Sequence, residues 1–211
     1  MSQRRLFVAG ATGATGQVLL ELASRRQVDV LAHARPQSAA RLGDRKVAAL
    51  DLSDPKLPEA MKGCTTVVQL IGTMRNRFEA GDTYETSDIG TTRQLVEAAN
   101  ACGTVDHFVL LSSVGAGRPL GAYLKAKAEA ERLVTSSGIP FTLFRPSAFE
   151  DRKGAKGGPL GAFTRFFGLK KYEPIKVAQL ASAILLCATE RAPLGVALEG
   201  TSLWAVVAKV P

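Results

Sequence analysis

Tyr123 and Lys127 lie four positions apart in the stretch YLKAK, and the serine pair Ser112-Ser113 ends ten residues before the tyrosine. Residues at i and i+4 share one face of a helix, whereas Lys125 belongs to another face. A tyrosine hydroxyl so placed can donate a proton to a carbonyl, a lysine ammonium can lower the pKa of that hydroxyl, and a serine hydroxyl can orient the carbonyl. The spacing therefore predicts general-acid catalysis, with a plain helix start and a solvated lysine as the alternative.

The hydride for such a reduction has to come from a cofactor, and a glycine-rich stretch near the N-terminus offers a site for one. Gly10, Gly13 and Gly16 follow the apolar run Leu6–Ala9, and a helical pattern begins at Gln17. A strand, turn and helix of this kind let the backbone approach a pyrophosphate, with the amides of the helix N-terminus directed at the negative charge. The stretch predicts dinucleotide binding, and a purely structural turn is the alternative.

Two further positions predict which dinucleotide binds. Arg35 lies 19 residues after Gly16, where proteins with such a turn place the acid that binds the ribose 2′-hydroxyl. An arginine there suits a 2′-phosphate, so we expect NADP(H) rather than NAD(H). Asp51 ends the third expected strand and can accept a hydrogen bond from the adenine amino group, with Leu52 packing nearby. The alternatives are a solvated arginine and an aspartate that caps the turn at Ser53-Asp54-Pro55.

Short apolar runs alternate with helical patterns along the chain, which indicates βαβ units and a parallel sheet covered on both sides. We therefore predict a doubly wound parallel α/β sheet, a Rossmann-type fold, in a single domain that spans residues 1–211. The expected strands are Leu6–Ala9, Val28–His33, Lys46–Leu50, Thr66–Ile71, Phe108–Leu111 and Phe141–Phe144. The expected helices are Gln17–Arg25, Ile89–Asn100, Tyr123–Ser136 and Val177–Thr189, with shorter ones at Ser38–Leu42 and Leu57–Met61.

The composition fits a soluble protein with one core. Of the 211 residues 46% are hydrophobic, and no apolar run approaches the ~20 residues that would span a bilayer. The N-terminus shows no secretory pattern, so we expect a cytoplasmic protein. Cys64, Cys102 and Cys187 lack metal-site or disulfide spacing and are expected to be small buried side chains. The net charge of +8 and the pI of about 9.7 favour anionic partners.

Ligands of an open α/β sheet bind beyond the carboxyl ends of the strands, so Thr73–Tyr84 and Phe149–Tyr172 are the expected walls of a substrate site. The second segment interrupts the alternation and is expected to act as a lid. The basic and aromatic residues of both segments suit an anionic or aromatic small molecule, with a solvated rim as the alternative: Arg75, Arg77, Phe78, Arg152, Lys153, Phe163, Arg165, Phe166 and Phe167. No nucleic-acid module is recognisable. We expect neither nucleic acid nor a membrane as partner, and either a monomer or a homodimer.

The motifs AGATGATG, AHARP, ALDLSDP, VVQLIGT, SDIGTTRQLVEAA, HFVLLSSVGA, YLKAK and FRPSAF, in this order, resemble the short-chain dehydrogenases/reductases over nearly the whole chain. The resemblance is to the atypical branch near the Tat-interacting-protein-type oxidoreductases and the NmrA-like regulators. It implies Ser113, Tyr123 and Lys127 as the catalytic residues, with Ser112 as the second choice for the serine. The cofactor-binding positions that it implies, from the pyrophosphate to the nicotinamide, are Gly10, Thr12, Gly13, Ala14, Thr15, Gly16, Arg35, Asp51, Leu52, Ile71, Gly72, Ser112, Lys127, Pro146 and Ser147.

The chain departs from the family pattern in the helix after the fourth strand. Many members carry an asparagine where this chain has Ser87-Asp88-Ile89-Gly90, and the gap from Ser113 to Tyr123 is short, as in the atypical branch. Several members of that branch keep the cofactor and have lost turnover. The sequence therefore predicts an NADPH-dependent reductase of a small carbonyl, quinone or related acceptor, with a non-catalytic NADP(H)-binding sensor or scaffold as the second hypothesis.

Overall fold

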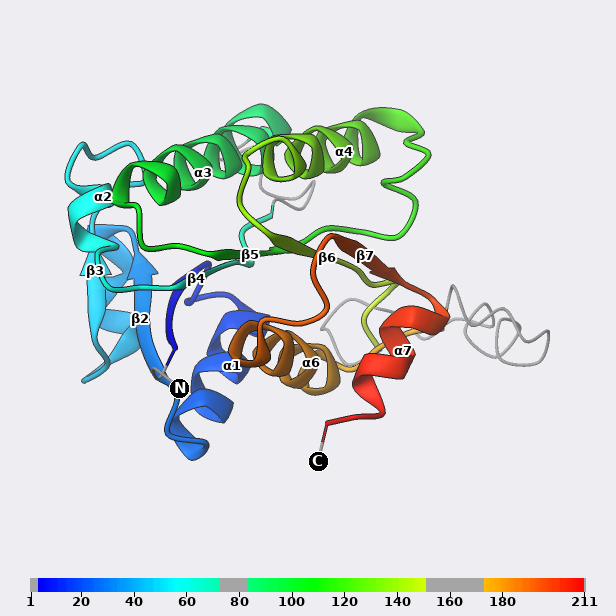
Figure 1. Ribbon diagram of the computed structural model, residues 1–211, viewed down its shortest axis with the longest axis horizontal. Coiled ribbons are helices and arrows are strands. Elements are labelled where there is room, and N and C mark those ends of the chain that lie inside the picture. Colours follow the sequence, from blue (N-terminus) through cyan, green and yellow to red (C-terminus); the bar gives the residue numbers. More distant parts are fainter. Residues whose placement is uncertain (1–3, 73–82, 151–172, 211) are drawn as a thin grey trace.

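The computed structural model describes residues 4–72, 83–150 and 173–210 and shows one parallel β-sheet between two layers of helices (Figure 1). Within these residues, seven strands pair in parallel in the order β3-β2-β1-β4-β5-β6-β7. The chain runs outward from β1 in both directions, so the predicted doubly wound Rossmann-type sheet is confirmed. The strands are β1 Arg5–Ala9, β2 Asp29–Ala34, β3 Val47–Ala49, β4 Thr66–Gln69, β5 His107–Leu111, β6 Phe141–Arg145 and β7 Val196–Glu199.

The helices divide between the two faces of the sheet (Figure 1). One face carries α1 (Ala14–Arg25), α6 (Val177–Glu190) and α7 (Thr201–Val207). The opposite face carries α2 (Leu57–Ala60), α3 (Thr91–Cys102) and α4 (Gly121–Thr135). A 3₁₀-helix, Pro36–Leu42, follows β2, and a π-helix, Glu85–Gly90, runs directly into α3.

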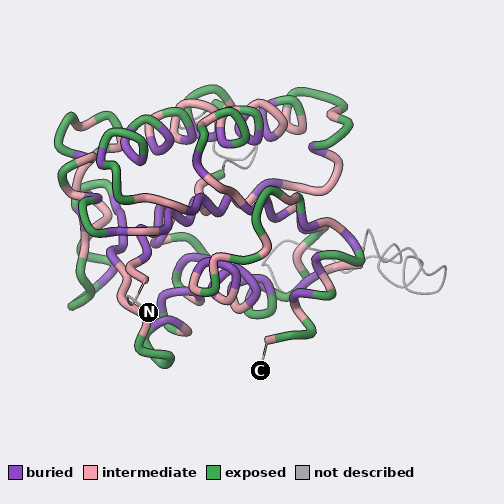
Figure 2. Tube along the Cα trace, viewed as in Figure 1, coloured by how far each residue is buried: buried purple, intermediate pink, exposed green. Residues whose placement is uncertain are grey.

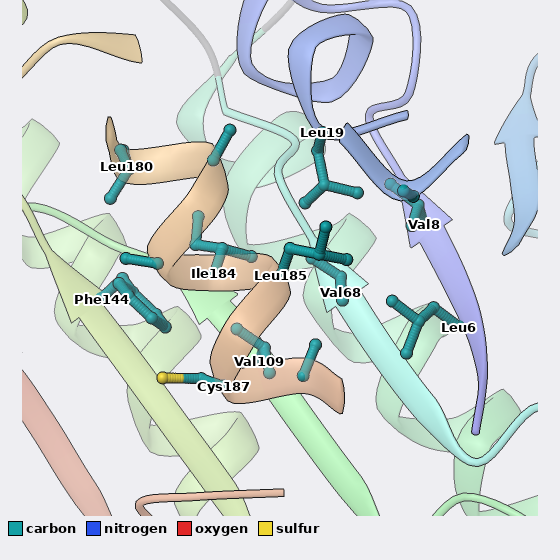
Figure 3. Packing of buried hydrophobic residues seen from close by; sticks show 14 of the residues in the cluster. Leu6, Val8, Leu19, Val68, Val109, Phe144, Leu180, Ile184, Leu185 and Cys187 are labelled. Carbon is teal, nitrogen blue, oxygen red and sulfur yellow. The ribbon is translucent and has the colours of Figure 1, made fainter. Parts of the chain in front are cut away.

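Alternate residues of the central strands pack into separate cores on the two sides of the sheet. In β1, Leu6 and Val8 belong to the cluster with α1 and α6, whereas Phe7 and Ala9 belong to the cluster with α2, α3 and α4. Figure 3 shows the first cluster, in which Ile184 of α6 lies among side chains of several strands. The buried strands stand out at the centre of Figure 2. Burial on both faces explains why these strands read as continuous apolar runs rather than as alternating patterns.

The predicted elements are confirmed, with shifted ends, and the structure adds some that the sequence analysis missed. Helix α1 begins at Ala14 instead of Gln17, because the amide of Gln17 already donates to the carbonyl of Gly13 (2.9 Å). The helix expected from Ile89 is α3, which begins at Thr91 after a π-helical turn. Strand β7 and helix α7 were not predicted; both are short, with four and seven residues, and only Leu198 of β7 is buried.

All three cysteines are free and buried, as predicted. Burial raises the pKa of the Cys64 thiol to about 11 and that of Cys187 to about 12, which keeps both protonated at neutral pH. The described residues contain no cluster of three or more His, Cys, Asp or Glu side chains that could hold a metal ion. None of the helices in these residues has both the length and the apolar character needed to cross a membrane.

Candidate functional site

A cavity of about 520 Å³ lies at the carboxyl ends of the strands, beside the point where the order reverses between β1 and β4. This is where an open α/β sheet binds its ligands. Its walls come from the glycine turn after β1, the segments that follow β2 to β6, the π-helix, and helices α3 and α4. The lining residues are Gly10, Thr12, Gly13, Ala14, Thr15, Gly16, His33, Ala34, Arg35, Asp51, Leu52, Ser53, Leu70, Ile71, Gly72, Thr86, Ser87, Thr91, Gln94, Leu111, Ser112, Tyr123, Lys127 and Phe149.

The glycine turn forms a cradle that side chains would fill. Gly10 has φ +85°, and a Cβ on it would lie 2.9 Å from the backbone nitrogen of Ile71. A Cβ on Gly16 would lie only 2.3 Å from the carbonyl oxygen of Gly10, so α1 could not pack this closely on the turn. Gly13 is different, because a Cβ there would approach only the oxygen of Gly10, at 3.3 Å, and the residue is exposed at the cavity.

The start of α1 completes the cradle. The helix begins at Ala14, its N-cap residue Gly13 supplies no side-chain cap, and no acidic side chain lies in its first turn. The first amides of a helix lack partners within the helix and carry partial positive charge. Ala14, Thr15 and Gly16 all line the cavity. An anion of the size of a pyrophosphate fits this arrangement of close backbone and free amides.

The far end of the cavity has the residues predicted for the adenosine half of a dinucleotide. Arg35 is exposed at the N-cap of the 3₁₀-helix, and Asp51 and Leu52 follow β3. His33, which the sequence analysis did not select, is buried beside them with its Nε2 2.8 Å from the oxygen of Leu50. Burial lowers the pKa of His33, so the imidazole is neutral at pH 7.

Helix α4 brings Tyr123 and Lys127 to the opposite wall of the same cavity. The ammonium of Lys127 lies 5.9 Å from the centroid of the Tyr123 ring, and the ring of Tyr84 packs 5.7 Å from that of Tyr123. Lys125 is exposed on a different face of the helix, as the spacing predicted. The tyrosine and the lysine are therefore next to each other at a site where a ligand can reach both.

Lys127 is held by an aspartate that the sequence analysis noted only as a departure from the family pattern. Its Nζ lies 2.7 Å from Asp88 Oδ1, and the two side chains are only 8% and 1% exposed. Asp88 comes from the π-helix, and the oxygen of Leu111 accepts a second bond from Lys127 at 3.5 Å. Gly72 leaves room for this pair, since a Cβ on it would lie 3.0 Å from Nζ. An acidic residue in the connection after the fourth strand was the only sequence signal for this contact.

A second buried network lies one turn further along α4. Ser112 donates a hydrogen bond to Glu131 (2.5 Å), and both residues are buried. Arg145 donates to both carboxylate oxygens of Glu131, at 2.9 and 2.5 Å, and also contacts Glu199 at 3.3 Å. The bond to Glu131 raises the pKa of the Arg145 guanidinium. Glu131 follows Tyr123 and Lys127 at the same helical interval, and that continued spacing is the signal that could have identified it.

The serine that lines the cavity is Ser112, the second choice from the sequence. Ser113 is half-buried, bonds the oxygen of Val114 at 3.4 Å and is absent from the cavity wall. Of the two serines, Ser112 is the one beside the buried network of α4, since its hydroxyl bonds Glu131. Pro146 and Ser147, expected near the nicotinamide, are also absent from the wall, because Ser147 turns its hydroxyl to the oxygen of Glu173. Most of the expected lid, at 151–172, and of the expected loop, at 73–82, lies outside the described residues, whereas Phe149 lines the cavity and Tyr84 packs on Tyr123.

Residues 10–191 match the model of a protein family described as NAD(P)H-binding, and the chain belongs to that family. The match covers the glycine turn, Tyr123 and Lys127. It agrees with the resemblance to the atypical short-chain dehydrogenases/reductases that the motifs indicated.

Individual relatives are distant. An uncharacterised chloroplastic protein of Arabidopsis thaliana is 29% identical over an alignment of 170 residues that covers 70% of this chain and 60% of that protein, so this chain spans less than two thirds of its relative. The solved structure of MoeE5 in complex with UDP-glucose and NAD has a TM-score of 0.71 at 21% identity, covering 92% of this chain and 75% of that one. The NADPH-dependent quinone oxidoreductase QOR2 of Escherichia coli, solved with NADPH, has a TM-score of 0.70 at 20% identity, covering 92% and 68%.

Proposed function

We propose that the protein is an NADPH-dependent oxidoreductase that reduces a small carbonyl, quinone or related acceptor. The observation that supports the proposal is that Tyr123 and Lys127 line the same cavity as the glycine turn. A nicotinamide cofactor held by that turn supplies the hydride when it is bound. The relatives solved with NADPH and with NAD are consistent with a redox dinucleotide in this cavity.

In this proposal Tyr123 is the proton donor. Its hydroxyl gives a proton to the acceptor oxygen, and the ammonium of Lys127 stabilises the tyrosinate that forms. Asp88 and the oxygen of Leu111 hold Lys127 at the cavity wall. Ser112 is the serine at the site, since its neighbour Ser113 does not line the cavity. Arg35, exposed at the adenosine end, supports NADPH as the preferred dinucleotide because an arginine fork can bind a 2′-phosphate.

NADPH oxidation measured against a panel of aldehydes, ketones and quinones tests the proposal. In Tyr123→Phe, which removes one hydroxyl, turnover should fall by a factor of about 10² to 10⁴ while NADPH affinity is kept. Lys127→Ala should reduce both. Lys125→Ala is the matched control, since it removes the same charge from an exposed position of the same helix. Full activity in Tyr123→Phe would show that the proton comes from elsewhere.

The second candidate is a non-catalytic NADP(H)-binding sensor. The observation that favours it is the buried pair of Lys127 and Asp88, because the aspartate neutralises the charge that Tyr123 would use. Tight NADPH binding by the wild type without oxidation across the whole panel would support the sensor over the enzyme.

A further inference from the structure

We propose that Ser112 acts toward the ligand as a hydrogen-bond acceptor, and that Glu131 is the positioning residue that imposes this polarity. The ligand group against Ser112 must then be a donor: an amide N–H or a hydroxyl at the nicotinamide end of the cofactor, or a hydroxyl of the substrate. The inference deepens the proposed function and rests on it in taking the cavity for a dinucleotide site.

The polarity follows from the partners of Glu131. Arg145 donates two hydrogen bonds to this carboxylate, at 2.9 and 2.5 Å, and the pair is largely buried, with side chains 18% and 7% exposed. A guanidinium has donors only, so both oxygens of Glu131 act as acceptors toward Arg145, which is the pattern of a carboxylate. In the 2.5 Å contact between Ser112 and Glu131, the proton therefore belongs to the serine and lies on the bond.

A serine has one proton and two lone pairs. With the proton committed to Glu131, only the lone pairs of Ser112 remain for the cavity, which the residue lines. A carbonyl oxygen of a substrate would meet these lone pairs unfavourably. The role of donor to the carbonyl is thus left to Tyr123, and Ser112 binds the N–H or O–H side of a ligand.

The test combines calorimetric titration of NADPH with steady-state kinetics on Ser112→Ala. Loss of one accepted hydrogen bond should weaken binding about threefold to tenfold. If the donor is on the cofactor, the dissociation constant of NADPH rises by that factor. If the donor is a substrate hydroxyl, NADPH affinity is unchanged and the KM of the second substrate in the alcohol-oxidising direction rises instead.

Glu131→Gln tests the positioning role. The glutamine amide can donate to Ser112, which turns the serine proton toward the cavity, so the affinity should fall as in Ser112→Ala. In the Ser112→Ala background the same change should have no further effect, a non-additivity that a purely structural role of Glu131 would not produce. Glu129→Gln is the matched control, because Glu129 lies on the same helix and pairs with Arg132 at the exposed surface. The affinity of Glu129→Gln for NADPH should equal that of the wild type.

Thermal unfolding of each variant without ligand shows whether it folds. If Glu131→Gln does not fold, Ser112→Cys replaces it, since a thiol is a weak acceptor and should behave as Ser112→Ala does. Unchanged NADPH affinity and unchanged KM in Ser112→Ala would overturn the inference, as would a loss confined to Ser113→Ala. A wild type that binds NADPH and turns over nothing would contradict the proposed enzyme alone. In that case the titration of Ser112→Ala decides, and unchanged affinity overturns the inference.

Discussion

At the glycine end of the cavity, formed by the turn from Gly10 to Gly16, the shape comes from backbone segments that lie very close together. A Cβ on Gly16 would be only 2.3 Å from the carbonyl oxygen of Gly10. At the tyrosine end, it comes from charged side chains buried in pairs, Lys127 with Asp88 and Glu131 with Arg145. The first end needs residues without side chains, and the second needs charges that are matched. The two ends should therefore fail in different ways when they are changed.

The two ends of the cavity carry different unfavourable contributions to the free energy of folding. A glycine turn costs backbone entropy but buries no charge. A buried ion pair loses the hydration of two charges, and the loss is offset only while both partners are present. Changes at the glycine end should act on ligand binding wherever space allows a side chain, whereas changes at the tyrosine end should also lower the stability of the fold.

The largest expected effect is on ligand binding in Gly13→Val. A Cβ at this position meets only the oxygen of Gly10, at 3.3 Å, so the fold can accept a side chain there with a small shift. The branched side chain would occupy the space through which the amides of α1 reach an anion. We expect a folded protein without measurable dinucleotide binding, checked by circular dichroism together with NADPH titration.

Gly16→Val is the contrasting variant at the same turn. Its Cβ would lie 2.3 Å from the oxygen of Gly10 and 2.7 Å from the Cα of Ala11, so the turn and helix α1 cannot keep their present packing. We expect this variant to lose thermal stability as well as binding. Retained NADPH binding in Gly13→Val would mean that the cradle serves only as a structural turn.

The same contrast explains how far the sequence could predict the site. The glycine turn lies within seven residues of chain, and spacing alone located it. The pairing of Asp88 with Lys127 joins residues from the π-helix and α4. Which charges meet depends on how those elements pack, and a single sequence does not contain that information directly.

Local ambiguity accounts for the remaining errors. Ser112 and Ser113 are chemically identical neighbours, and the path of the backbone beyond β5 decides which one lines the cavity. Strand β7 was missed because it is a strand of only four residues at the edge of the sheet, and of these only Leu198 is buried. The fold class was predictable because it depends on the alternation of many strands and helices, in which one missed element changes little.

At the tyrosine end, the expected effect is a loss of stability in Asp88→Asn. Asp88→Asn keeps the size of the side chain but leaves the ammonium of Lys127 buried without an opposite charge. Breaking a buried pair in this way costs about 3–5 kcal/mol of unfolding free energy. Urea denaturation monitored by circular dichroism measures the change.

Glu59→Gln is the control for the loss of unfolding free energy expected in Asp88→Asn. Glu59 pairs with Lys62 at 2.6 Å, close to the distance in the buried pair, but both side chains are exposed. An exposed pair contributes about 0–1 kcal/mol. If Asp88→Asn were no more destabilising than Glu59→Gln, the buried pair would not be the feature that distinguishes the two ends of the cavity.

The smallest expected effect belongs to Arg35, a cationic side chain at the glycine end that is exposed at the cavity rim. Its removal leaves no buried group unpaired, so stability should not change. Charge-assisted hydrogen bonds to a 2′-phosphate contribute about 1.5–3 kcal/mol, which corresponds to a loss of about tenfold to 150-fold in NADPH affinity for Arg35→Ala. NADH, which lacks that phosphate, should bind equally well to the wild type and the variant.

Calorimetric titration of both dinucleotides into Arg35→Ala and Arg41→Ala separates a specific contact from a general effect of charge. Arg41 lies on the same 3₁₀-helix, is exposed, and does not line the cavity, so its removal lowers the net charge equally. A specific contact makes only Arg35→Ala lose the preference for NADPH, and raising the salt concentration should narrow the difference between the cofactors in the wild type. If both variants lost the same NADPH affinity, the preference for NADPH over NADH would come from the overall positive charge of the protein. Equal affinity of the wild type for NADPH and NADH would remove Arg35 from cofactor selection, and the glycine end would then recognise its ligand through backbone alone.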